Sequence, residues 1–185
     1  MTHRRQRICM KRRTALVLIT ALLLLSILSS CSRHTGQNNP SDSSPSQGQS
    51  SVQKDTQSAL ALLSKSTTLP ALPGAYLEGV DVEAFEKTEN GSIVEYSCES
   101  LGLYYVFEKG DTEESSKLLS VKFTSARHAI FGISVGDSVM DAELMISSSG
   151  FALEKSNAES TFAKGSLKII ISHEGGKISS VNVSL

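Results

Sequence analysis

The chain of 185 residues predicts an α+β fold, with short helices packed on an antiparallel sheet. Three observations support this class. From Ser92 onward, short segments alternate apolar and polar residues with a period of two. Glycine-rich turn signals separate these segments, and one stretch with helical spacing stands between them. Trp is absent and aromatic residues make up 5% of the chain, so the core must consist mainly of Ile, Val and Leu.

The first 30 residues have the order of a secretory signal peptide. Six of the 18 Lys and Arg residues lie before residue 14, and Ala15 to Leu28 is apolar except for Thr20 and Ser26. A transmembrane helix needs about 20 apolar residues, so this run is too short for a comfortable one. Residues 1–30 are therefore predicted to be a targeting segment.

The end of this segment, Leu28-Ser29-Ser30-Cys31, resembles the lipobox of bacterial lipoproteins. The resemblance implies cleavage before Cys31 and a diacylglyceryl group on its thiol. Cys31 is thus the predicted lipid attachment site. The expected location is the extracytoplasmic face of the cell membrane, or the outer membrane in a bacterium with two membranes. Ser32 permits either, since it is not the aspartate that often retains lipoproteins at an inner membrane.

Residues 31–54 are rich in Ser, Gln, Asn, Pro and Gly. Such a stretch buries too little apolar surface to offset its ordering entropy, so a flexible tether with a mean span of about 25 Å is expected. The α+β domain is then expected to occupy residues 55–185. From Ser32 onward there are 12 basic and 19 acidic residues, a formal charge of −7. This balance argues against binding to nucleic acid.

The domain begins with a predicted helix at Thr56 to Lys65, where Ala59, Leu60, Leu62 and Leu63 have amphipathic spacing. Pro70 and Pro73 prevent its continuation. Acidic residues are frequent in 78–89 but lack the spacing of a calcium loop, so no metal or cofactor is expected. Cys98 is the domain's single cysteine, which argues against a disulfide framework.

The first group of predicted strands is Ser92 to Cys98, Leu101 to Glu108 and Lys117 to Thr124. In the second, Leu103, Tyr105 and Phe107 share one face, and Tyr104 and Val106 share the other. The alternation of the third strand predicts that Leu119, Val121 and Phe123 lie together.

The second group begins with a short strand in which Phe131, Ile133 and Val135 alternate. A helix is predicted from the Gly136-Asp137-Ser138 opening to about Ser149, with Asp137 or Ser138 as its cap and Gly150 as its stop. Its inward residues are Val139, Ala142 and Ile146. Three strands follow at 159–164, 166–172 and 177–184, and Gly175-Gly176 is predicted to turn the last hairpin.

The two groups resemble each other in order. Phe85, Tyr96, Ser100 and Leu101 match Phe151, Phe162, Ser166 and Leu167 at an offset of 66, and residues 118–124 match 178–184 at an offset of 60. We therefore predict a diverged tandem repeat of a helix-plus-three-strand unit, at about 68–126 and 128–185. The alignment puts the first helix at 71–83, where Pro73, Gly74 and Gly79 oppose it, and the Thr56–Lys65 segment is an alternative.

The stretch "GISVGDSVMDAELMISSSGF" at 132–151 resembles the opening of BamE-like and beta-lactamase-inhibitor-protein-like modules. Gly136 matches the glycine before the helix and Gly150 the one that ends it. Phe151 stands near the place of a proline that often follows, and the first copy lacks the opening motif. The resemblance implies a small α+β binding or assembly module without catalytic chemistry.

Gly132-Ile133-Ser134-Val135-Gly136 fits the G-x-S-x-G pattern of serine hydrolases, with His128 or His173 as bases and Asp137 or Asp141 as orienters. That motif needs an elbow between a strand and a helix on a large parallel sheet, whereas Ser134 falls inside an alternating strand. The two histidines also lack metal-ligand spacing. A hydrolase using Ser134 is therefore the least favoured reading.

The favoured interpretation is non-catalytic binding of a cell-envelope protein or cell-wall partner through a sheet face or a groove between the repeats. Tyr104 or Tyr105 is a candidate contact, depending on which faces the core. The alternative is inhibition of a secreted or envelope enzyme by insertion of an acidic loop such as 108–114.

Overall fold

The computed structural model describes residues 47–155 and 158–185. The predicted signal peptide, Cys31 and residues 31–46 of the predicted tether lie outside the described residues. Pro45–Leu185 form one compact unit with its own hydrophobic core. Within the described residues, no helix has both the length and the apolar character to cross a membrane.

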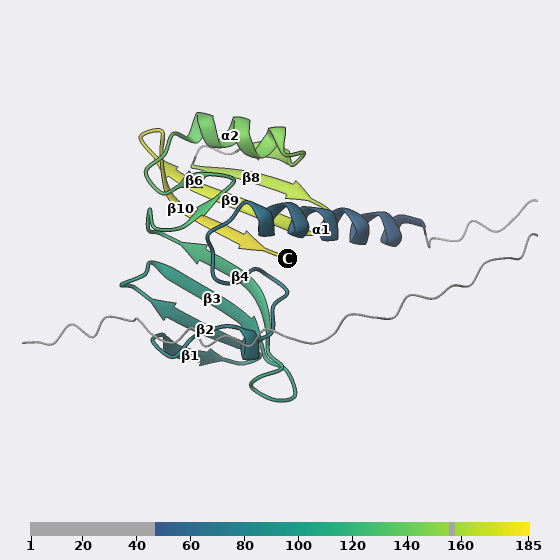
Figure 1. Ribbon diagram of the computed structural model, residues 1–185, viewed down its shortest axis with the longest axis vertical. Helices are drawn as coiled ribbons and strands as arrows, with labels where there is room; N and C mark the ends of the chain where they lie inside the picture. Colours follow the sequence, from purple (N-terminus) through teal and green to yellow (C-terminus); the bar gives the residue numbers. More distant parts are fainter. Residues whose placement is uncertain (1–46, 156–157) are drawn as a thin grey trace, which may run out of the picture. The chain divides into compact units, whose positions relative to one another are not determined.

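An eight-stranded antiparallel sheet organises this unit, and its strand order is β1-β2-β3-β4-β10-β9-β8-β7 (Figure 1). The strands of the first half are β1 (Glu86–Asn90), β2 (Ile93–Cys98), β3 (Leu103–Glu108) and β4 (Lys117–Phe123). Those of the second half are β7 (Ala152–Lys155), β8 (Glu159–Lys164), β9 (Leu167–Glu174) and β10 (Lys177–Ser184). With helices α1 (Gln47–Lys65) and α2 (Val139–Ser148), the α+β class is confirmed.

The core lies on one face of the sheet. Its largest fully buried side chains include Tyr105, Phe107, Phe123 and Phe162 from the strands. Helix α1 packs against β8 and β9, and α2 packs against β7 and β8. Among the described residues, no helix packs in this way against the first half of the sheet. Among the buried residues of the same core cluster are Leu69, Ala71, Leu77 and Val80, from the segment between α1 and β1.

Helix α1 begins at Gln47 instead of Thr56, so it includes residues 47–54 that were expected to belong to the tether. Thr56 holds the extra turns in place through two hydrogen bonds. Its Oγ1 donates to the Val52 carbonyl at 2.8 Å and accepts from the Ser166 backbone N–H at 2.7 Å, at the β8–β9 turn. The side chains from Ser50 to Asp55 are exposed and, except for Val52, polar, so hydrophobic periodicity did not reveal these turns.

The prediction that Leu119 shares a face with Val121 and Phe123 is wrong. Val106 pairs with Ser120 while the next residue, Phe107, pairs with Leu118, so Leu119 is the extra residue of a β-bulge. The bulge turns Leu118 into the core, where it is fully buried, and leaves Leu119 half-buried. A bulge reverses the alternation, which a strict period of two does not anticipate.

The short strand predicted from Phe131 to Val135 is instead a hairpin of β5 (Ala129–Ile130) and β6 (Ile133–Ser134). Its turn residues Phe131 and Gly132 have φ angles of 50° and 76°, the positive pair that a type I′ turn requires. The Phe131 ring packs edge-to-face on Phe151 at 5.7 Å between centroids. This contact compensates for the unusual backbone of a bulky residue.

The remaining predicted elements of the second half are confirmed. Ser138 caps α2 by accepting from the Asp141 N–H, Val139, Ala142 and Ile146 are buried, and Gly150 has φ 84° after the helix. Gly175 and Gly176 turn the β9–β10 hairpin with positive φ angles. Strand β7 was not predicted. In the first half, residues 71–83 form no α-helix, and a single 3₁₀ turn at Leu77–Gly79 stands there.

Candidate functional site

The candidate site is the face of the sheet opposite the core. We call it the open face, because its side chains remain accessible. Strand alternation decides which residues reach it. Tyr105 is 1% exposed and belongs to the core, whereas its neighbour Tyr104 is half-buried on the open face. The question left open by the sequence is therefore answered in favour of Tyr104.

The strand register aligns the open face into rows. Tyr104 of β3 pairs with Lys122 of β4, and Lys122 pairs with Asn182 of β10. Asn182 in turn pairs with Ile170 of β9. Directly opposed side chains have Cβ atoms about 5 Å apart, so these four residues form a continuous row across the middle of the sheet.

A shallow hollow of about 590 Å³ lies over this row. Its lining comes from six strands or their ends: Glu95, Tyr104, Val106, Ser120, Lys122, Thr124, Glu159, Ile170, Ser172, Ser180 and Asn182. The short side chains of Ser120 and Ser180 line it beside the row, and the longer Tyr104 and Ile170 stand to either side. The hollow thus spans the β4–β10 junction, where the two halves of the sheet meet.

The chemistry of the hollow suits binding. Serine hydroxyls and the Asn182 amide offer hydrogen bonds, while Tyr104, Val106 and Ile170 offer apolar contact. Lys122 contributes a cation between the carboxylates of Glu95 and Glu159, and Ser172 donates to Glu159 at 3.2 Å. Among the described residues, no group of three or more His, Cys, Asp or Glu side chains has metal-site geometry.

The residues of the G-x-S-x-G pattern have other partners. The Ser134 backbone N–H donates to Asp137 Oδ2 at 2.7 Å, which braces the loop before α2. His128 Nε2 lies 3.1 Å from the Leu101 carbonyl, and His173 lines a different hollow beside α2. The described contacts therefore do not join Ser134 to either histidine.

His128 is a buried side chain outside the hollow. Since its Nε2 donates to the Leu101 carbonyl, its Nδ1 is an acceptor, and this buried atom has no hydrogen-bond partner in the described structure. Burial lowers the pKa of His128, and the nearby Arg127 adds to this effect, whereas the hydrogen bond to Leu101 opposes it. Cys98 is buried as a free thiol, and its Sγ lies 3.3 Å from Ser100 Oγ.

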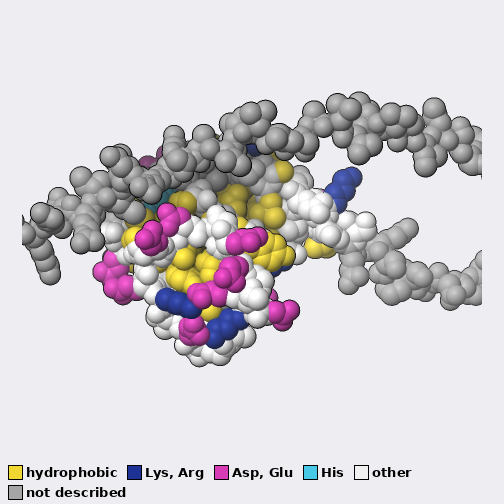
Figure 2. All heavy atoms as spheres, turned by 60° about the horizontal axis from the view of Figure 1, so that its bottom comes forward, with side chains coloured by type: hydrophobic (Ala, Val, Ile, Leu, Met, Phe, Trp, Pro, Cys, Tyr) yellow, Lys and Arg dark blue, Asp and Glu magenta, His cyan; other side chains and the backbone are white. Residues whose placement is uncertain are grey.

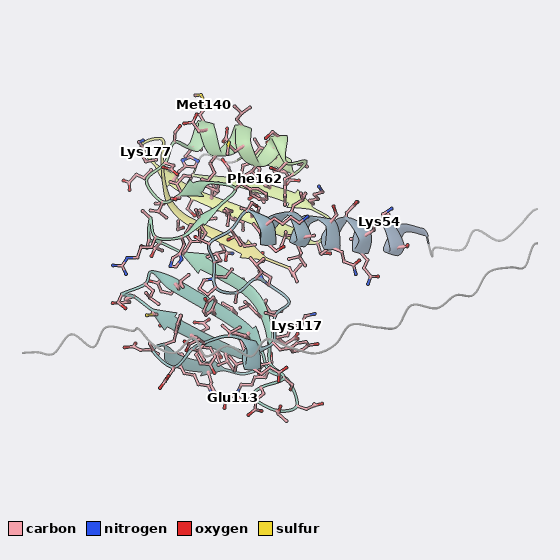
Figure 3. All side chains as sticks on the ribbon, viewed as in Figure 1. Lys54, Glu113, Lys117, Met140, Phe162 and Lys177 are labelled. Atoms are coloured by element: carbon pink, nitrogen blue, oxygen red, sulfur yellow. The ribbon has the colours of Figure 1, made fainter. Side chains whose placement is uncertain are left out.

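The acidic loop after β3 is fastened to the first strands. Glu113 accepts from Lys87 at 2.8 Å and from the Tyr96 hydroxyl at 3.0 Å, while Glu89 pairs with Lys87 and Lys109. We call these five residues the charge clip. Figure 2 views this end of the molecule, where acidic side chains surround a small apolar area, and Figure 3 shows Glu113 at its tip.

The charge clip shifts several pKa values. Hydrogen bonds from Lys109 and Lys87 lower the pKa of Glu89 to about 2. Those from Lys87 and Tyr96 also lower the pKa of Glu113. The pKa of Lys87 rises because it donates to both carboxylates. The four charged side chains of the clip are accessible to solvent, so the clip is expected to order the loop more than it stabilises the fold.

Comparison of the chain with family models, with curated proteins and with solved structures finds no match.

Sequence reasoning missed Ser120, Ser180 and Asn182, although they line the centre of the hollow. Serine and asparagine in a strand carry no individual signal. Ser120 and Ser180 each follow a β-bulge, and Asn182 is paired with Lys122 at the β4–β10 junction. These positions are set by pairing between strands that are far apart in the sequence.

Proposed function

We propose that this chain is a lipid-anchored extracytoplasmic protein whose domain binds a cell-envelope partner, without catalysis, through the open face of the sheet. The observation that carries the proposal is the hollow across the β4–β10 junction. It combines accessible apolar groups with many hydrogen-bonding groups. Its partner is an envelope protein or a cell-wall component.

The anchor is supported by the order of the first 31 residues: a basic start, an apolar run and the lipobox-like Leu28-Ser29-Ser30-Cys31. Fifteen residues, 32–46, stand between Cys31 and the start of α1. Covalent geometry limits the reach of a segment of this length to about 55 Å. The domain would therefore stay close to the membrane.

The proposal includes a diverged tandem repeat, which several structural pairs support. Under an offset of 60, Lys122 corresponds to Asn182, and these two residues are paired with each other. Their neighbours are paired in the matching way, Val121 with Val183 and Phe123 with Val181. This is the register that a local twofold relation between the halves would produce.

The loops before the central strands support the same relation. Gly74 has φ 96° and donates to the Leu118 carbonyl at 2.7 Å. Gly136 has φ 95° and donates to the Ile178 carbonyl at 2.9 Å. When Gly74 is matched to Gly136, the 3₁₀ turn at Leu77–Gly79 falls where α2 begins in the second half. The first copy would then have lost its helix to Pro73 and Gly79.

Enzyme inhibition by the 108–114 loop is a second candidate, which the charge clip favours. A loop fixed before binding loses less entropy when it inserts into a partner. Adding the purified domain to envelope hydrolases, and comparing wild type with Glu113→Gln, tests this candidate. Absence of inhibition by the wild type would remove it.

Site-specific photo-crosslinking in intact cells tests the main proposal. A photoreactive amino acid at Tyr104 is expected to give a saturable crosslink, and the same group at Lys54 on the exposed side of α1 is the control. Asn182→Arg fills the hollow and should abolish the Tyr104 crosslink. Cys31→Ser should release the protein from the membrane fraction. Equal crosslinking at Tyr104 and Lys54 would refute the binding face.

A further inference from the structure

Helix α2 presents an apolar outer face that the fold does not use. Met140 is 78% exposed, Leu144 is 72% exposed and Met145 is 44% exposed. Met140 and Leu144 are four residues apart, so they lie on the same side of the helix. Figure 3 shows Met140 pointing away from the sheet, while Phe162 lies inside beneath the helix. The buried side of α2 is formed by Val139, Ala142 and Ile146.

This outer face continues into a hollow of about 390 Å³ between α2 and the β9–β10 turn. Met140 forms an apolar lip of the hollow, and Glu143, Ser160 and His173 give it a polar lining. Ser160 is 1% exposed and donates to Glu143 Oε1 at 2.7 Å, so the carboxylate is held in a fixed place. The surface therefore combines an apolar stripe with a positioned negative charge.

The charges identify the kind of occupant. Helix α2 carries Asp141 and Glu143 and contains neither Lys nor Arg. Helices that lie on membranes combine an apolar face with basic residues, so α2 lacks the feature that attracts anionic lipid. A second copy of α2 would bring acidic residues against acidic residues. A basic partner matches both the stripe and its carboxylates.

We infer that the outer face of α2 is a docking surface, separate from the open sheet face, for a basic amphipathic segment of a partner protein. Apolar side chains of the segment cover Met140 and Leu144, and its Lys or Arg side chains lie beside Asp141 and Glu143. Methionine suits such a surface, because its flexible side chain adapts to different apolar partners.

Methyl NMR tests this inference directly. Of the four methionines, Met1 and Met10 belong to the leader, so the chain of residues 32–185 retains Met140 and Met145, both on α2. This chain includes the whole compact unit. The probe is a helical 14-residue peptide of leucine and lysine. Control peptides replace every lysine by glutamate, or every leucine by glutamine.

Saturable shifts of both methyl signals are expected with the leucine–lysine peptide and with neither control. Met140→Gln combined with Leu144→Gln should weaken binding at least about tenfold, with thermal unfolding unchanged because both side chains are exposed. Asp141→Lys should weaken the lysine peptide and strengthen the glutamate peptide. Asn182→Arg, on the open sheet face, should leave this binding unchanged, so the two surfaces are tested independently.

Three results would overturn the inference. One is equal binding of the lysine and glutamate peptides. Another is perturbation of the methyl signals by phosphatidylcholine–phosphatidylglycerol vesicles and not by the peptide, which would indicate a membrane surface. The third is a concentration-dependent shift without any peptide, which would indicate a second copy.

Discussion

Leu119 of β4 and Ser179 of β10 are each the extra residue of a β-bulge, and each lies three residues before the central Lys122–Asn182 pair. The two central strands are therefore irregular at corresponding points. Each bulge is followed directly by a serine of the hollow, Ser120 or Ser180. Bulges bend strands and re-aim side chains, so the shape of the candidate site depends on the same irregularities that interrupt the strand pattern.

The bulge in β4 predicts opposite outcomes for two adjacent leucines. Leu118→Ala removes a fully buried side chain and should lower the free energy of unfolding by about 2–5 kcal/mol. Leu119→Ala should lower it by less than about 1 kcal/mol, since Leu119 lies outside the core cluster. Urea unfolding measures both. Equal losses would contradict the assigned register.

Tyr104 and Tyr105 form a second matched pair. Tyr105 is 1% exposed and its ring packs near Phe85 and Phe107, so Tyr105→Ala should lower the free energy of unfolding by about 3–5 kcal/mol. Tyr104→Ala should change stability little and weaken partner binding instead. Thermal unfolding and the crosslinking assay separate the two effects. Loss of stability in the Tyr104 variant would argue that its face is covered.

Part of this fold could be predicted from the sequence. Alternation placed Tyr105 and Phe107 together correctly, and the cap and stop of α2 followed from Ser138 and Gly150. Both signals are local, because they depend on neighbours within one element.

The failures depend on contacts far apart in the sequence. The bulge at Leu119 depends on pairing with β3, and the extra turns of α1 depend on Ser166. The β5–β6 turn depends on the positive φ of Phe131, whose ring packs on Phe151. The open face could not be assigned from the sequence for the same reason. Alternation identified two faces of β3, but only the packing of the helices and the 69–85 segment decides which one is buried.

Gly165 and Gly175 test how α1 is held. Both have a positive φ, 62° and 58°, so replacement by alanine strains either turn by about 1 kcal/mol. A Cβ at Gly165 would also meet the Thr56 side chain and the Val52 carbonyl, whereas one at Gly175 meets nothing within 4 Å. Gly165→Ala should therefore lose more stability than Gly175→Ala, together with hydrogen-exchange protection in α1. Equal protection of α1 in both variants would exclude this role of the turn.

Removing the Glu113 carboxylate should loosen the loop between β3 and β4. Glu113→Gln loses the ion pair with Lys87, so faster hydrogen exchange is expected at residues 109–116 with little change in the melting temperature. The pKa values of Glu89 and Glu113 are lowered in the folded state, so the clip is present at neutral pH and weakens as pH falls below about 4.5. High salt should mimic the variant. Unchanged exchange in both conditions would show that the clip does not order the loop.

His128 should make the fold less stable in mild acid. Its Nε2 donates to the Leu101 carbonyl, its ring packs edge-to-face on Phe123, and its buried Nδ1 has no partner in the described structure. Protonation would bury a charge and an unpaired N–H. The pKa of His128 is lowered in the folded state, so the unfolded chain binds more protons once pH falls below about 6.5, the ordinary value. The stability contributed by neutral His128 is thus full at higher pH and is lost as pH falls through this range.

Thermal unfolding between pH 8 and pH 5 should show a steeper decline for the wild type than for His128→Phe, which lacks the titrating group but keeps a ring against Phe123. His173→Gln is the matched control and should keep the wild-type slope, and identical slopes in all three proteins would mean that another group governs the acid sensitivity.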